Sequence, residues 1–225
     1  MQDQHAPVFW RDGEVPVSAR FDDPYFSLED GLAETRHVFL AGNGLPGRFC
    51  DGFHVAELGF GTGLNLLAAL QAWRAAGVPG RLCYTSFEAF PMAPEDMRRA
   101  QGRFAELAPL AAELAPLWRG GAQEITLPDL RFTLVAGDAR ATLRHWPGVA
   151  DAWFLDGFSP AKNPEMWQPE LLAEVARHTA RGGMAATYTA AGFVRRGLEA
   201  AGFSVSRVPG YGRKRHMTRA ILDRQ

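Results

Sequence analysis

Residues 57–63 read Glu57-Leu58-Gly59-Phe60-Gly61-Thr62-Gly63 and follow directly on the short apolar run 54–58. Glycines at alternate positions permit a tight turn and let the backbone approach a ligand closely at the start of a helix. A dinucleotide site has the spacing G-x-G-x-x-G, because a pyrophosphate must sit on the helix N-terminus. Here the spacing is G-x-G-x-G, and Glu57 stands two residues before the first glycine. That acid would repel a pyrophosphate and suits a ligand that bears ammonium and sulfonium groups.

Short apolar runs alternate with helical patterns on the C-terminal side of this turn, which is typical of βαβ units around a parallel sheet. The Gly210-Tyr211-Gly212 link is too short for a parallel crossover, so the last two strands are predicted to be antiparallel. Gly182-Gly183 suits the C-cap of the preceding helix. We expect strands over residues 54–58, 82–88, 132–136, 150–155, 184–188, 203–208 and 217–222, and helices over 63–73, 94–104, 107–118, 169–178 and 191–201.

The first 52 residues do not follow this alternation, but they hold many aromatic side chains and turn residues. So many apolar groups are not typical of a disordered tail. We therefore expect residues 1–52 to form an ordered extension packed on a core of residues 53–225, within a single domain of residues 1–225.

Acidic residues stand at or just after the ends of four successive predicted strands: Glu57, Glu88, Asp138 and Asp156. Ligands bind beyond the carboxyl ends of the strands of an open parallel sheet, so these acids are expected to meet there. Glu88 is placed to accept both ribose hydroxyls of a nucleoside, and Asp138 to accept an adenine amino group. Alternatively, each acid only caps the helix that follows it, as Asp138 could.

The acids and the glycine turn together favour a class I S-adenosylmethionine-dependent methyltransferase. Its fold is Rossmann-like, with a mostly parallel sheet, an antiparallel last strand and the N-terminal extension. S-adenosyl-L-methionine is then the cofactor. The residues expected to bind it are Glu57, Gly59, Gly61, Gly63, Glu88, Asp138 and Ala139.

The loop after residue 155 is the candidate site of methyl transfer. An aliphatic amine acceptor is mostly protonated at neutral pH, and a carboxylate can both attract that cation and take its proton. Asp156 is the candidate for this role, while Phe158 would stack on a base or exclude water, and Asn163 would hold the acceptor. Alternatively, Asp156 only accepts hydrogen bonds from loop amides, and Asn163-Pro164 starts a turn.

Composition indicates which partners and which cellular compartment to expect for such an enzyme. The formal net charge is −1 and the sequence pI is about 6.6, so contact with nucleic acid would need a local basic patch. Two cysteines and scattered histidines show no metal-ligand spacing, and a reducing compartment is expected. The N-terminus lacks the order of a secretory leader, and no apolar run approaches the ~18–20 residues that span a bilayer. We expect a cytoplasmic protein without metal or membrane.

Residues 155–167, LDGFSPAKNPEMW, resemble the signature loop of the MnmC-type tRNA methyltransferase family. Further stretches with the same resemblance are residues 23–27, 38–45, 59–65 and 210–217, so the similarity covers nearly the whole chain in order. The resemblance implies N-methylation of 5-aminomethyl-2-thiouridine at the tRNA wobble position, giving 5-methylaminomethyl-2-thiouridine. The Asn163-Pro164-Glu165 order departs from the Asn-Pro-Pro-aromatic order of many enzymes that methylate nitrogen, so the geometry of those loops is not carried over.

Many members of this family carry a fused FAD-dependent oxidase domain, which trims a carboxymethyl group first. This chain has no second glycine-rich dinucleotide motif. The resemblance therefore implies a stand-alone methyltransferase, with separate enzymes supplying the aminomethyl precursor.

The densest basic run, Arg213-Lys214-Arg215-His216, is the candidate contact with the phosphates of a tRNA anticodon loop. It could instead be a solvated hairpin. The splayed wobble base would stack on aromatic side chains. The candidates for this stack are Tyr25, Phe26, Phe158 and Trp167, of which the first two could instead anchor the extension.

Two other functions stay open at this stage. One is a methyltransferase or aminopropyltransferase acting on a small amine, because the same cofactor fold serves many acceptors. The other is a non-catalytic RNA-binding module.

Overall fold

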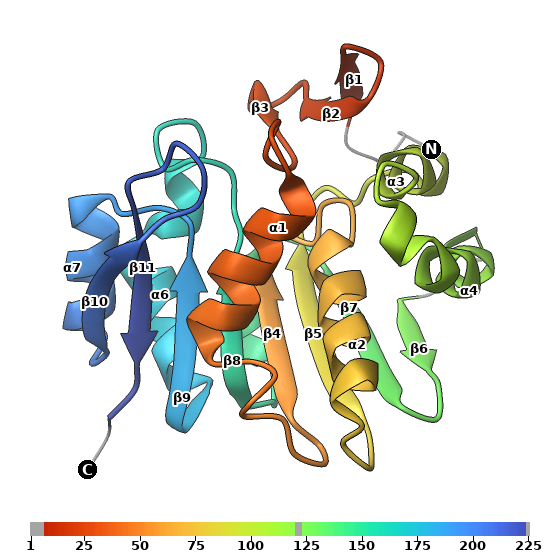
Figure 1. Cartoon of the computed structure of the whole chain (residues 1–225). Helices are drawn as coiled ribbons and strands as arrows, with labels where there is room; N and C mark the ends of the chain where they lie inside the picture. The colour runs from red at the N-terminus through yellow and green to blue at the C-terminus, as the bar shows by residue number, and fades with distance from the viewer. Residues whose placement is uncertain (1–6, 120–122, 224–225) are drawn as a thin grey trace.

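A computed structural model describes residues 7–119 and 123–223. Its centre is an eight-stranded sheet in the order β10-β11-β9-β8-β4-β5-β7-β6 (Figure 1). The strands are β4 (His54–Leu58), β5 (Leu82–Glu88), β6 (Glu124–Thr126), β7 (Leu130–Ala136), β8 (Ala150–Leu155), β9 (Thr179–Thr187), β10 (Ser204–Pro209) and β11 (His216–Ile221). The helices of this core are α2 (Leu64–Ala76), α3 (Pro94–Gln101), α4 (Ala108–Arg119), α5 (Ala139–Thr142), α6 (Pro169–Arg177) and α7 (Gly192–Ala200), with short turns η3 (Ala105–Leu107), η4 (Leu143–His145) and η5 (Pro164–Trp167).

The five central strands β9, β8, β4, β5 and β7 are parallel, and β11 is antiparallel to both of its neighbours. The sequence-based prediction of a mostly parallel sheet with a reversed last strand is thereby confirmed. The short strand β6 was not predicted, and it pairs antiparallel with β7 at the other edge of the sheet. Three residues are too few to show a periodic pattern in the sequence.

Each face of the sheet is covered by a layer of helices. Within β8, Phe154 belongs to the core under α2, α3 and α4, whereas Trp153 belongs to the core under α5, α6 and α7. This alternation follows from the period of two in a strand, which points successive side chains to opposite faces. Both side chains are fully buried, so the two cores share the sheet as a common wall.

The N-terminal segment forms regular structure of its own. A small three-stranded sheet of β1 (Val8–Arg11), β2 (Val15–Ser18) and β3 (Asp23–Pro24) stands beyond the carboxyl ends of the parallel strands (Figure 1). A continuous helical stretch follows, made of α1 (Gly31–Thr35), η1 (Arg36–Leu40) and η2 (Ala41–Asn43). It lies across the face that also carries α2, and it buries Val38, Phe39 and Leu40 there. Residues 1–6 of the expected extension lie outside the described residues.

The prediction for Gly182-Gly183 was wrong. Helix α6 ends at Arg177, and both glycines lie inside β9, which begins at Thr179 rather than at residue 184. Gly182 has φ +71°, and the pairing with β8 shifts register between Ala150 and Ala152. The glycines therefore permit a local irregularity in the strand and do not end a helix.

Local sequence signals determine several boundaries. Asp30 caps α1 by accepting a hydrogen bond from the Ala33 amide at 2.9 Å. Gly77 ends α2 in the left-handed conformation, with its amide donating to the Arg74 carbonyl.

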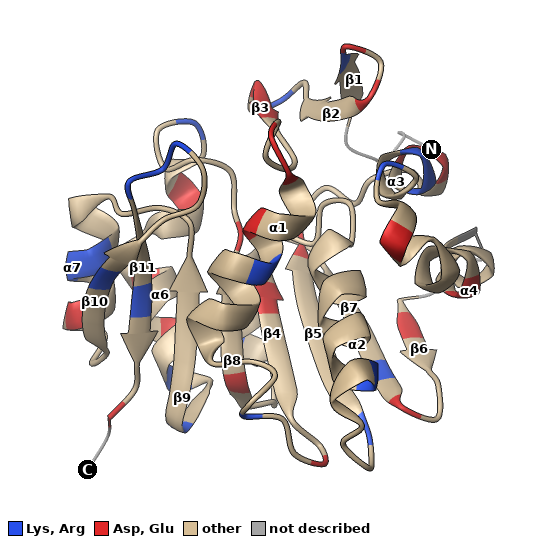
Figure 2. Cartoon of the chain, in the orientation of Figure 1, with Lys and Arg blue, Asp and Glu red and all other residues tan. Residues whose placement is uncertain are grey.

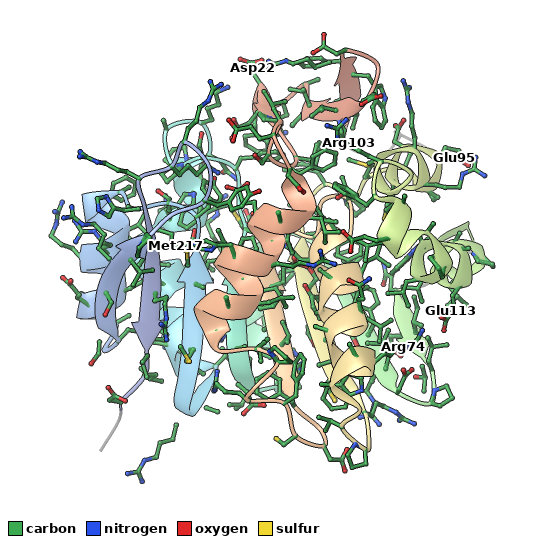
Figure 3. The ribbon with its side chains drawn as sticks, viewed as in Figure 1. Asp22, Arg74, Glu95, Arg103, Glu113 and Met217 are labelled. Carbon is green, nitrogen blue, oxygen red and sulfur yellow. The ribbon has the colours of Figure 1, made fainter. Side chains whose placement is uncertain are left out.

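Side-chain contacts then join these elements to one another. The Arg74 guanidinium connects α2 to neighbouring segments, because it pairs with Glu113 and Asp129 at 2.7 Å each (Figure 3). Met217 projects from β11 toward the N-terminal helical stretch, and the Gly42 backbone lies against it (Figure 3).

Within residues 7–119 and 123–223, no helix combines the length and the apolar character needed to cross a membrane.

Replacing Leu66 by Ala tests the packing between α2 and the sheet. Leu66 is fully buried, so its truncation is expected to lower the free energy of unfolding by about 2–5 kcal/mol. Leu28→Ala is the matched control, because Leu28 is 46% exposed. Urea denaturation of both variants measures the difference, and equal losses would show that α2 does not pack as described.

Candidate active site

One large cavity of about 920 Å³ opens at the carboxyl ends of β4, β5 and β8. Residues of the N-terminal segment close its outer side, and residues of the core form its floor. The walls carry seven acidic residues, which are Asp23, Glu29, Glu34, Glu88, Asp138, Asp156 and Glu165, and four basic ones, which are Arg20, Arg140, Arg213 and Lys214. This excess of acidic side chains favours a ligand that brings positive charge.

The glycine turn between β4 and α2 forms one wall of this cavity. Gly59 has φ +90°, and a Cβ atom there would lie 2.4 Å from the Asp156 carbonyl oxygen. Gly61 has φ +53°, and its amide donates a hydrogen bond to Glu88 Oε2 at 3.1 Å. Gly63, at φ +73°, is the cap from which α2 starts. The turn therefore needs glycine for its backbone conformation and for its close contact with the loop after β8.

Glu88 and Asp138 both line the cavity, but in different charge environments. Glu88 accepts hydrogen bonds from the amides of Gly61 and Phe90, and burial raises the pKa of its carboxyl above the usual range. Asp138 caps α5 through the Arg140 amide, and its ion pair with the Arg140 guanidinium holds its pKa low. Asp138 thus caps a helix and lines the cavity at once, next to buried Ala139.

Glu57 lies beneath the cavity, and not among the residues that line it. Its carboxylate is completely buried and accepts hydrogen bonds from Ser86 Oγ at 2.6 Å and Asn65 Nδ2 at 2.9 Å. Burial raises the pKa of Glu57 to about 8 despite these hydrogen bonds. Glu57 therefore reaches the cavity only through Asn65.

Asn65 links Glu57 to Asp156, because the same amide nitrogen donates to Asp156 Oδ2 at 2.6 Å. The side-chain oxygen of Asn65 accepts a hydrogen bond from Thr35 Oγ1 at 2.9 Å. Burial raises the pKa of Asp156 to about 7, and the nearby charge of Glu34 raises it further while that of Lys214 lowers it. A carboxyl group poised near neutral pH is suited to exchange a proton.

Sequence reasoning did not identify Asn65, Thr35 or Glu34 as part of this site. Asn65 is a polar residue one position into a helix whose neighbours are apolar and buried. This position could have identified Asn65 from the sequence, because a polar side chain on a buried face needs hydrogen-bond partners and so indicates a polar site nearby.

Aromatic side chains gather where the loop after β8 meets the N-terminal segment. The Phe158 ring lies 4.9 Å from Phe21 and 5.1 Å, edge-on, from Tyr25. Trp167 lies behind this group, and its indole nitrogen donates to the Phe158 carbonyl at 2.9 Å. Asn163 lines the same wall and is largely buried.

Phe26, another of the expected stacking residues, packs edge-on against Phe104 at 5.2 Å and also borders the cavity. Its ring is thus part of the core that anchors the N-terminal segment as well as part of the cavity wall.

The three basic residues of the link between β10 and β11 have different surroundings. Arg213 is 94% exposed and pairs with Glu29, and Arg215 is also exposed. Lys214 instead points toward the cavity, where its ammonium group lies 2.7 Å from Glu34 Oε1 and 4.2 Å from the centre of the Tyr188 ring. The structure therefore brings Lys214 to the acidic site, while Arg213 stands at the rim of the cavity and Arg215 lies at the surface. Figure 2 shows the link between β10 and β11 as a basic segment.

The residues present fit an S-adenosylmethionine molecule. The left-handed glycine turn leaves room for close backbone contact, and the Glu88 carboxylate and the acidic walls match hydroxyl donors and a sulfonium cation. No cluster of three or more histidine, cysteine or acidic residues arranged for a metal ion occurs in the described part of the chain.

A family model described as S-adenosyl-L-methionine-dependent methyltransferase matches residues 104–223, more than half of the chain. The chain therefore belongs to the S-adenosyl-L-methionine-dependent methyltransferases, and the predicted class, fold and cofactor are confirmed.

Among its relatives are two proteins called "tRNA 5-methylaminomethyl-2-thiouridine biosynthesis bifunctional protein MnmC". The one from Caulobacter vibrioides is 49% identical over 96% of this chain and 38% of the relative. The one from Pseudomonas aeruginosa is 48% identical over 95% of this chain and 34% of the relative. The chain thus spans little more than a third of the length of these proteins.

A solved structure shows the same similarity. The crystal structure of MNMC2 from Aquifex aeolicus is 26% identical to this chain, with a TM-score of 0.75, and the match covers 100% of this chain and 72% of that one. The resemblance first seen in residues 155–167 is therefore confirmed in sequence and in fold.

Gly59→Ala tests the glycine turn. The new Cβ would collide with the Asp156 carbonyl in a left-handed backbone, so cofactor affinity and melting temperature should both fall. Gly77→Ala is the control, because Gly77 is also left-handed (φ +64°) but has nothing within 4 Å of its Cβ position. Calorimetric titration with S-adenosylmethionine and thermal unfolding compare the two. If both variants bind S-adenosylmethionine equally well, close backbone contact at Gly59 is not needed to bind the cofactor.

Proposed function

We propose that this chain methylates the amine of 5-aminomethyl-2-thiouridine at the wobble position of tRNA, giving 5-methylaminomethyl-2-thiouridine. The observation that carries the proposal is the Asp156 carboxyl group, poised near neutral pKa in an acid-lined cavity beside the glycine turn. The names of the MnmC relatives, which are 48–49% identical over nearly all of this chain, supply the substrate.

The cofactor would lie against the turn of Gly59, Gly61 and Gly63. Glu88 would accept its ribose hydroxyls, and Asp138 with Ala139 would face its adenine. Glu57 would contribute from below, by fixing Asn65 and through it the floor of the cavity. When bound, S-adenosylmethionine supplies an electrophilic methyl group on a sulfonium.

Asp156 would act as the proton acceptor of the reaction. Its ionised carboxylate attracts the substrate's ammonium group and takes one proton, which frees the nitrogen lone pair for attack on the methyl group. The hydrogen bond from Asn65 holds Oδ2 of Asp156 in place for this transfer. Asp156 thus orients the acceptor and activates it.

The aromatic group around Phe158 would hold the nucleobase. Phe21 and Tyr25 buttress Phe158 from the N-terminal segment, so its ring is fixed at the cavity wall. Unpaired RNA bases stack on such rings. Asn163 lies on the same wall and would bind polar atoms of the turned-out base.

The anticodon loop would approach over the link between β10 and β11. Arg213 and Arg215 are exposed there and are suited to contact phosphates. Acting on tRNA would be consistent with a location in the cytoplasm, and the aminomethyl group must be present on the tRNA before this reaction.

The direct experiment is nucleoside mass analysis of tRNA that carries 5-aminomethyl-2-thiouridine, after incubation with the protein and S-adenosylmethionine. A mass increase of one methyl group on that nucleoside is expected. Transfer to polyamines but not to tRNA would show instead that the acceptor is a small amine.

Replacing Asp156 by Asn is expected to abolish turnover while cofactor affinity stays, because the amide cannot take the proton. Since burial raises the pKa of Asp156 to about 7 in the free protein, the wild-type kcat/KM should rise with pH around that value as the carboxyl loses its proton. Asp129→Asn, in an exposed ion pair with Arg74, is the control. Full activity of the Asp156→Asn protein would remove this residue from the chemistry.

Replacing both Arg213 and Arg215 by Ala should weaken tRNA binding and reduce its dependence on salt. Each lost phosphate contact lowers the slope of log affinity against log salt concentration by roughly 0.7–0.9. Arg181→Ala is the control, because Arg181 is exposed near the start of β9, at the opposite end of this strand from the cavity. Filter binding between about 50 and 200 mM salt measures the slopes. An unchanged slope would show that the phosphates lie elsewhere.

A further inference from the structure

Lys214 reaches from a surface link into the cavity and is held there by two different groups. Its ammonium nitrogen lies 2.7 Å from Glu34 Oε1 and 4.2 Å from the centre of the Tyr188 ring. The Tyr188 hydroxyl donates to the Gly157 carbonyl at 2.8 Å, which fixes the ring. A carboxylate and an aromatic face together form a binding arrangement for an alkylammonium ion.

This arrangement adjoins the proposed proton acceptor. Glu34, Tyr188 and Asp156 all line the same cavity, and the charges of both Glu34 and Lys214 influence the Asp156 carboxyl group. Thr35, the neighbour of Glu34 in α1, donates to the amide of Asn65 that holds Asp156. An amine bound between Glu34 and Tyr188 would therefore be close to the group that takes its proton.

We propose that the Glu34 carboxylate and the face of Tyr188 form the subsite for the ammonium group of the RNA substrate, and that Lys214 occupies this subsite until RNA binds. The inference rests on the proposed function. A lysine side chain ends in the same –CH₂–NH₃⁺ group that an aminomethyl nucleoside presents. Lys214 is thus a stand-in for the substrate in the free protein.

The position of Lys214 on the chain provides the means of exchange. It lies between Arg213 and Arg215, in a link that is exposed on both sides of the lysine. The ion pair of Arg213 with Glu29 is solvent-exposed and contributes little, so it is readily exchanged for a phosphate. Movement of the arginines onto phosphates would withdraw Lys214, and the incoming ammonium would keep Glu34 paired. The largely buried carboxylate would then never lose its cation.

The test compares the affinity of two tRNAs, one with 5-aminomethyl-2-thiouridine and one with unmodified uridine at the wobble position. The dissociation constant of the unmodified tRNA divided by that of the aminomethyl tRNA measures recognition of the ammonium group separately from the phosphates. This ratio is expected to exceed one in the wild type. Glu34→Gln should bring the ratio about tenfold closer to one, as expected for loss of a charge-assisted hydrogen bond. Lys214→Met should raise the ratio at least threefold, because no lysine then competes with the substrate's ammonium group for the subsite.

Glu106→Gln is the matched control, because Glu106 also pairs with a basic residue, Arg36, but lies outside the cavity lining. It should leave the ratio unchanged. A Lys214→Met protein that loses discrimination would overturn the inference, since Lys214 would then support the subsite and not occupy it. A ratio of one in both the wild type and Lys214→Met would overturn it as well. Failure of the wild type to methylate the aminomethyl tRNA would instead refute the proposed function.

Discussion

The amide of Asn65 is the contact on which the site depends. Two carboxyl groups, Glu57 and Asp156, are brought together where water is largely excluded, and one –NH₂ group donates to both. Without such a donor, burial and mutual repulsion would favour their protonation still more strongly. Thr35 donates to the amide oxygen and thereby fixes which end of the amide faces the acids. One side chain thus joins the N-terminal segment, α2, β4 and the loop after β8.

The protein as a whole is nearly neutral, yet its charges are separated in space. Acidic side chains are concentrated in the cavity, while basic residues occur on the link between β10 and β11 and on α7, β10 and β11 (Figure 2). Such a distribution can attract a phosphate backbone to the rim and a cationic group to the interior. The net charge of −1 therefore says little about partners, because it averages over an acidic cavity and a basic rim.

Features that depend on residues close together in the chain could be predicted from the sequence. The glycine turn and the acids at strand ends follow from neighbours in the chain, so the sheet, the glycine turn and the position of Asp156 could be predicted. Glu34 could not, because its partner Lys214 lies 180 residues away. Gly182-Gly183 was misassigned for a similar reason, since only the pairing of β9 with β8 shows why glycines stand inside a strand.

The contact between Glu34 and Lys214 also bears on how the protein is made. Lys214, the residue that pairs with Glu34, is translated 180 residues after it. Contacts between such distant segments form late, because loop closure costs entropy before the contact is gained. The pocket of the nascent chain therefore stays incomplete until the link between β10 and β11 has been translated and Lys214 has reached Glu34.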